Sequence, residues 1–213
     1  MADDYRNTKY CPCLTQISDK KKAVETAVHA AHPKAKDMHT YISNRKMPFL
    51  DQFMEAYNWK CSYCGVSISV LPQKMFEVDH FIPKESSRFN KKSEAGYIEN
   101  LVLSCYDCNR GKSSLELSET SHNKIYPDGN EITVTFVRDN DYYIRVSESS
   151  KEDADVQTFY KSLNLGSQAH RLDYLLMNMR GLREQLRDKP KVCGKLSEAI
   201  DLLQTKRNLI KET

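Results

Sequence analysis

The sequence predicts an α+β protein, because helical periodicity occurs near both ends of the chain and strand-like patterns lie between them. Apolar residues recur every three to four positions before residue 58 and again after Ser167, as in amphipathic helices. Short segments between these regions alternate apolar and polar residues, which indicates strands. We expect a helical region at 1–58, a cysteine-rich core at 59–115, a linker and hairpin at 116–150, and a helical region at 151–213.

Two helices are predicted before the core. The first covers residues 19–31, with Ser18 as N-cap and Pro33 as the residue that ends it. The second covers residues 47–57, with Pro48 in its first turn and an apolar face. Because this second helix leads directly into the core, we expect it to brace the core.

Two Cys-x-x-Cys pairs lie in the core, Cys61 with Cys64 and Cys105 with Cys108. Each pair can place two thiolates on one ion, and together they complete the tetrahedral shell of structural zinc. A closed shell has no position for water. Any chemistry is therefore expected in the segment between the pairs.

That segment and the second pair contain residue types suited to proton transfer and to binding a hard cation. His80 can accept a proton near neutral pH. Asp79 points to the opposite face if both residues lie on a strand, and its carboxylate can bind a cation together with the amide oxygen of Asn109. One carboxylate and one amide leave positions for water and phosphate, as magnesium prefers.

From Trp59 to Lys112, the order of these elements resembles the HNH endonuclease family, in a variant with Asn at the third motif position. The resemblance rests on Asp79-His80, Asn100, Asn109, Ile82-Pro83 and Asn100-Leu101. It implies a ββα-metal core, structural zinc, a catalytic Mg²⁺ or Mn²⁺ and a nucleic-acid substrate, with DNA favoured. It also implies a supporting role for Asn100, which braces the loop and orients the base. Lys84, Arg110 and Lys112 are the phosphate candidates, because they lie beside this motif in the sequence.

Each signal also has a purely structural interpretation. A cysteine quartet alone is typical of zinc ribbons, His80 can bond a backbone carbonyl, and Asn109 can cap a helix that begins there. Together these interpretations describe a zinc-knuckle protein that binds nucleic acid without catalysis. That protein and a stand-alone restriction-type HNH nuclease are the alternative functions.

After the core, residues 131–137 and 142–146 alternate around the polar segment 138–141, which predicts a hairpin. From Ser167, two apolar stripes separated by Lys189-Pro190 predict an antiparallel helix pair. These stripes can pack on the core or form an interface with a partner or a second copy.

The net charge of +3 is small for a protein that holds a duplex unaided, so we expect a partner that presents the nucleic acid. The chain layout is similar to the HNH subunits of Septu-type and retron-associated anti-phage systems, which implies an ATPase partner.

No apolar run approaches the length of a membrane span, and the N-terminus does not resemble a signal peptide. Thiolate ligands also favour a reducing compartment, so we expect a cytoplasmic location. Cys11, Cys13 and Cys193 are expected to be free thiols, because Cys11-Pro12-Cys13 has no second cluster to pair with.

Overall fold

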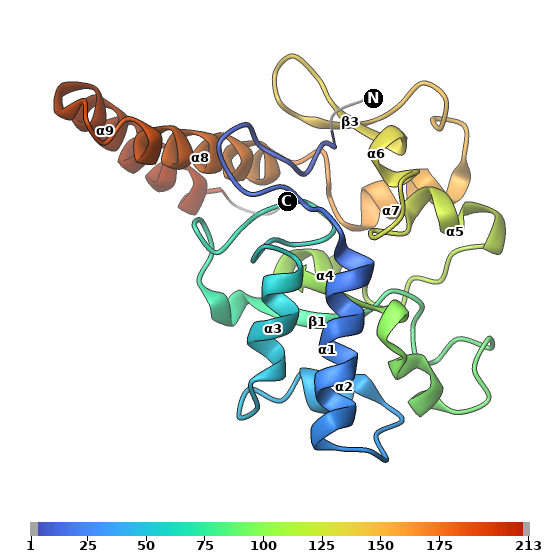
Figure 1. The fold of residues 1–213 in the computed structure, drawn as a ribbon. Coiled ribbons are helices and arrows are strands. Elements are labelled where there is room, and N and C mark those ends of the chain that lie inside the picture. Colours follow the sequence, from blue (N-terminus) through green and yellow to red (C-terminus); the bar gives the residue numbers. More distant parts are fainter. Residues whose placement is uncertain (1–3, 211–213) are drawn as a thin grey trace.

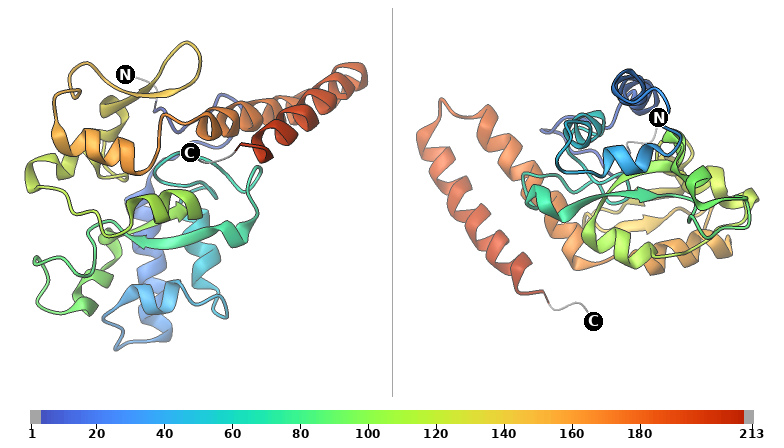
Figure 2. Two further views of the ribbon diagram at one scale, coloured as in Figure 1. Left: turned by 180° about the vertical axis from the view of Figure 1, so that it is seen from behind. Right: turned by 90° about the horizontal axis from the view of Figure 1, so that it is seen from below.

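The computed structural model describes residues 4–210 and has the α+β architecture that the sequence predicts (Figure 1). Two small antiparallel sheets of two strands each lie among the helices. A continuous hydrophobic core contains side chains from Tyr5 to Leu165. The C-terminal helix pair extends away from this body (Figure 2).

Three N-terminal helices pack beside the central sheet: α1 (Ile17–Ala31), α2 (Met38–Ile42) and α3 (Phe49–Ala56). Helix α1 begins at Ile17, so the expectation of Ser18 as N-cap is wrong. Ile17 is partly buried against the core, and the helix therefore includes a residue that the capping pattern places outside it. Pro48 precedes α3 as its N-cap and does not lie in its first turn.

The central unit consists of two strands and a helix. Strand β1 (Phe76–His80) pairs antiparallel with β2 (Leu101–Cys105). The chain segment that connects the two strands contains the short helices Lys92–Gly96 and Ile98–Asn100. Every residue of β2 is buried, and the strand leads directly into α4 (Tyr106–Lys112), which contacts both strands.

Helix α4 starts at Tyr106, so the interpretation of Asn109 as a helix cap is wrong. A Cβ at Gly111 would lie 2.4 Å from the Ser162 carbonyl oxygen, which shows how closely α4 approaches the end of helix α7 (Ala154–Ser162).

The predicted hairpin is present but shorter than expected. Strands β3 (Phe136–Arg138) and β4 (Ile144–Val146) pair antiparallel, whereas residues 132–135 form helix α6 (Ile132–Thr135). Ile132 and Thr135 are both buried, and their spacing of three residues places both on one face of a helix. The preceding linker also contains a helix that the sequence did not predict, α5 (Glu119–Ile125).

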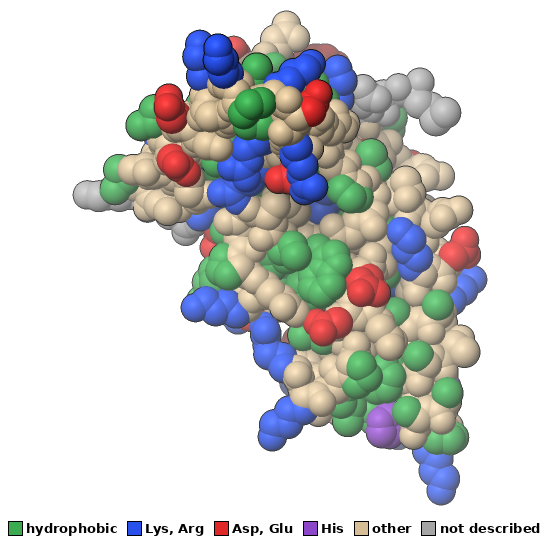
Figure 3. All heavy atoms as spheres, turned by 60° about the vertical axis from the view of Figure 1, so that its left-hand side comes forward, with side chains coloured by type: hydrophobic (Ala, Val, Ile, Leu, Met, Phe, Trp, Pro, Cys, Tyr) green, Lys and Arg blue, Asp and Glu red, His purple; other side chains and the backbone are tan. Residues whose placement is uncertain are grey.

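The C-terminal pair consists of α8 (Gln168–Gln185) and α9 (Pro190–Asn208), which pack along each other on either side of the predicted break. Ser167 caps α8 by accepting a hydrogen bond from the His170 amide. Residues 167–210 contain nine Lys and Arg against five Asp and Glu, and Figure 3 shows basic side chains gathered over this end of the molecule. Among residues 4–210, no helix is both long and apolar enough to cross a membrane.

Candidate active site and zinc centre

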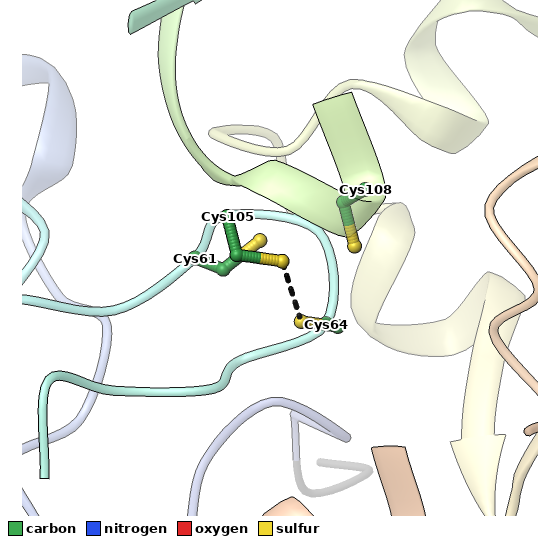
Figure 4. Close-up of side chains that lie close together, drawn as sticks. All are labelled: Cys61, Cys64, Cys105 and Cys108. Atoms are coloured by element: carbon green, nitrogen blue, oxygen red, sulfur yellow. Dashed lines mark hydrogen bonds between the residues drawn. The ribbon is translucent and has the colours of Figure 1, made fainter. Parts of the chain in front are cut away.

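Four cysteine side chains converge where the turn Cys61–Cys64, here called the first knuckle, faces the junction of β2 and α4 (Figure 4). All four are buried, and their sulfur atoms lie within 4.8 Å of one another. The sulfurs of Cys64 and Cys105 are 3.8 Å apart. A tetrahedron with Zn–S bonds of about 2.3 Å has edges of roughly 3.8 Å, so the cluster fits a structural zinc.

The first knuckle is held by its neighbours. The Ser62 amide donates to the Leu103 carbonyl oxygen of β2 at 2.7 Å. Gly65 has a φ of +82°, and a Cβ there would lie 2.5 Å from the Arg6 carbonyl oxygen. The knuckle is thus fixed between the central sheet and the N-terminal segment.

The other three cysteines are free thiols, as expected. The Cys11 thiol donates to the Met177 carbonyl oxygen at 3.3 Å, and the Cys193 thiol donates to that of Leu186 at 2.9 Å. Cys13 is exposed.

Beside the zinc centre, the end of β1 and helix α4 border a pocket of about 380 Å³. Its walls include Asp79 and His80 from β1, Asn109 and Arg110 from α4, and Lys84 from the following loop. Pairing of the strands and the turn into α4 therefore bring together most of the candidate residues. Asn100 lies outside this wall.

The Asp79 carboxylate is buried and lies on the side of β1 that faces α4. Its Oδ2 atom accepts a hydrogen bond from the Tyr63 hydroxyl at 2.7 Å and lies 3.2 Å from the Lys112 ammonium. Burial raises the pKa of Asp79, and the neighbouring Lys112 opposes that shift. Both contacts are made to Oδ2, so Oδ1 is the oxygen left for a cation.

His80 faces the other side of the strand, where its ring contacts that of His39 of α2, with centroids 4.4 Å apart and the ring planes tilted by 36°. His39 is itself held by a 3.2 Å contact between Nε2 and the Val78 carbonyl oxygen. Burial, with the neighbouring His39, lowers the pKa of His80 to about 4. The ring is therefore neutral at pH 7 and can accept a proton, as a weaker base than an unperturbed imidazole.

Asn100 uses its whole amide to hold the backbone that follows His80. Its Nδ2 donates to the carbonyl oxygens of Ile82 and Ala95 at 3.0 and 2.9 Å. Its Oδ1 accepts from the Ile82 amide at 2.8 Å. These contacts brace the loop without placing Asn100 against a substrate.

Asn109 is oriented by Glu77, which lies two residues before Asp79 on β1. The Asn109 Nδ2 group donates to Glu77 Oε2, and Arg110 donates to both oxygens of the same carboxylate at 3.2 and 3.3 Å. Because Nδ2 is engaged with Glu77, Oδ1 is the Asn109 atom available as a metal ligand.

Lys112 does not occupy the position expected of a phosphate ligand. Its side chain is 1% exposed, and its ammonium donates to the His80 carbonyl oxygen at 2.9 Å in addition to pairing with Asp79. The last turn of α4 packs against β1, and a buried ammonium needs such partners. The expectation that Lys112 contacts phosphate is therefore corrected. Its buried ammonium stabilises Asp79 and the His80 backbone, whereas Lys84 and Arg110 are exposed at the pocket.

Comparison with known families identifies the central unit. Residues 61–115 match the family model for HNH endonuclease. These residues form an HNH endonuclease domain. An HNH endonuclease domain implies phosphodiesterase activity and a nucleic-acid substrate. No curated protein and no solved structure matches the chain, so the similarity to anti-phage subunits gains no support.

Three residues at the HNH site were not singled out from sequence. Glu77 had a usable signal, since residues two apart on a strand share a face. Tyr63 lies inside the first knuckle but has no residue pattern that indicates its contact with Asp79. His39 lies outside the HNH domain, and only the packing of α2 brings it to His80.

Proposed function

We propose that this chain is a metal-dependent endonuclease that cleaves DNA in the pocket between β1 and α4. In this proposal His80 is the general base, Asp79 and Asn109 bind Mg²⁺ or Mn²⁺, and Asn100 is a supporting residue. The observation that carries the proposal is that Asp79, His80 and Asn109 line one pocket.

His80 suits the role of general base because its ring is neutral and reaches the pocket. It would take the proton from the attacking water as the new P–O bond forms and the P–O bond to the departing oxygen breaks. The His39 ring lies in contact with the His80 ring, and Asn100 fixes the backbone that follows His80. Both contacts restrict the direction in which the ring can accept the proton.

The donor atoms at the pocket fit a hard divalent cation. One carboxylate oxygen from Asp79 and one amide oxygen from Asn109 leave positions for water and phosphate oxygens, an arrangement that suits magnesium. A cation held there would neutralise charge on the scissile phosphate and the departing oxygen.

Lys84 and Arg110 are the proposed phosphate contacts. Both side chains are exposed at the pocket, and Arg110 is kept near it by Glu77 and by packing over the Tyr106 ring at 5.0 Å. Only these two cations are assigned to the pocket, so affinity is expected to be weak at cellular salt. The positive charge of residues 167–210 can supply further phosphate contacts.

A partner that presents the substrate remains part of the proposal. The helix pair α8–α9 extends from the body (Figure 2) and exposes Leu202 and Leu209 at 74% each, which supports a role in assembly with an ATPase subunit or a second copy. The place of this nuclease in an anti-phage system is a hypothesis that rests on sequence layout alone.

Incubation of zinc-replete protein with supercoiled plasmid, in Mg²⁺ or Mn²⁺, tests the proposal directly. Nicked or linear plasmid is the expected product. Parallel single-stranded DNA, double-stranded RNA and single-stranded RNA substrates identify the preferred class. Binding without any cleavage would instead support the non-catalytic zinc-knuckle protein, and cleavage of RNA alone would contradict the preference for DNA.

A further inference from the structure

We infer that Tyr63 is a positioning residue through which the zinc centre sets the geometry of the catalytic-metal ligand Asp79. This inference rests on the proposed function, because it assigns Asp79 to the cation. The first knuckle thereby has a second task beyond stabilising the fold.

Tyr63 lies between the two zinc ligands Cys61 and Cys64, and its side chain reaches from the knuckle to β1. Its hydroxyl donates to Asp79 Oδ2 at 2.7 Å, and the residue has no exposed surface. Its ring packs edge-on against Phe159, with centroids 5.6 Å apart. The hydroxyl is therefore held in place by both backbone and ring.

The contact restricts a carboxylate that would otherwise rotate. Tyr63 and Lys112 both engage Oδ2, which leaves Oδ1 as the oxygen for a cation. Partners of this kind orient metal ligands, and their loss typically weakens metal binding about 10- to 100-fold.

The knuckle is itself fixed by the N-terminal segment. The Tyr5 hydroxyl donates to the Tyr63 carbonyl oxygen at 2.5 Å, and one Arg6 nitrogen donates to the Ser62 carbonyl oxygen at 2.7 Å. Both residues lie outside the HNH domain and are buried. The position of Asp79 thus depends on a chain of contacts from the N-terminal segment through the knuckle to β1.

Manganese binding by zinc-loaded protein, measured by electron paramagnetic resonance, tests the inference without relying on cleavage. Tyr63→Phe keeps the buried ring and removes only the hydroxyl. We expect it to retain zinc and to bind Mn²⁺ about 10- to 100-fold more weakly than the wild type. Cleavage should recover toward the wild-type rate at saturating Mn²⁺, because the residue acts through Asp79.

Tyr57→Phe is a matched control. Tyr57 is also a buried tyrosine whose hydroxyl donates to a carboxylate, that of Asp128, at 2.9 Å. It removes a bond of the same kind elsewhere in the body, so Mn²⁺ affinity should stay at the wild-type level.

Asp79→Asn separates failure of this inference from failure of the proposed site. In one outcome, Asp79→Asn loses Mn²⁺ binding, while folded, zinc-loaded Tyr63→Phe binds Mn²⁺ as tightly as the wild type. That outcome would overturn the role of Tyr63 and leave the proposed metal site standing. If Asp79→Asn binds Mn²⁺ like the wild type, the proposed metal site is overturned, and the inference with it.

Discussion

The rings of His39 and His80 lie 4.4 Å apart, although His39 belongs to α2 and only His80 belongs to the HNH domain. Burial is the main cause that lowers the pKa of each ring. Two imidazoles in contact are mutually compatible only while at least one is neutral. The contact therefore makes the stability of the folded protein at acid pH depend on His80, the proposed general base, and on His39.

We expect the protein to lose stability as pH falls from about 6.5, the ordinary histidine pKa, towards 4. In this range unfolded histidines bind protons, whereas folded His80 stays neutral and folded His39 binds its proton only below its ordinary pKa, so protonation favours the unfolded state. His39→Gln removes one of these groups and should lessen the fall. Urea unfolding midpoints of the wild type and His39→Gln at several pH values, with zinc content monitored, measure this loss of stability. Equal pH dependence in both proteins would contradict the linkage.

His80→Ala should lower cleavage by roughly 10²- to 10⁴-fold, because it removes the proposed proton acceptor. Zinc content and the melting temperature should show that the variant remains folded. His29→Ala is a suitable control, since His29 is exposed on α1 and should leave cleavage unchanged. Near-normal cleavage by folded His80→Ala would rule out this assignment.

A melting experiment should distinguish the roles of the two metals. Removing zinc should unfold the HNH domain, because the binding energy of structural zinc is folding energy, and Cys61→Ser or Cys105→Ser should have the same effect. Removing Mg²⁺ should stop cleavage and leave the melting temperature nearly unchanged. Cys13→Ser, at an exposed thiol, is the control. Active, stable protein without zinc would refute the four-cysteine site.

Asp79→Ala should reduce Mg²⁺-dependent cleavage more than Asn109→Ala, because Asp79 supplies the only formal charge among the proposed ligands. Titration of cleavage against Mg²⁺ concentration measures both effects. Asp19→Asn removes an exposed carboxylate on α1 and should match the wild type. An Asn109 variant more impaired than the Asp79 variant would reverse the assigned order of ligands.

Leu202 lies on α9, and Leu209 is the C-cap of that helix, seven residues later. Each is 74% exposed, and this spacing places both on one outer face of the helix pair. We expect this face to contribute to assembly, with a partner or a second copy. Light scattering of the isolated chain and co-purification with neighbouring gene products measure assembly. Replacing both leucines by Gln should weaken it, whereas Val134→Gln, at another exposed apolar residue, should not.

A protein that stays monomeric, binds nothing and cleaves efficiently at physiological salt would leave α8 and α9 as scaffold.

The sequence alone determined the elements whose information is local. The spacing of Cys61, Cys64, Cys105 and Cys108 predicted the zinc cluster, since each pair lies within one turn. Asp79-His80, Asn100 and Asn109 predicted the HNH domain, and apolar periodicity predicted the helix pair. Each of these signals needs only neighbouring residues or a known order of motifs.

Tertiary structure decided the contacts that surround these residues. Lys112 looked like a surface cation in the sequence, but packing of α4 on β1 buries it against Asp79. Residues 132–135 alternate like a strand, but burial of Ile132 and Thr135 makes them helical. His39 reaches His80 only through the placement of α2. A linear pattern records which residues are neighbours in the chain, whereas burial and pairing depend on elements that meet only after folding.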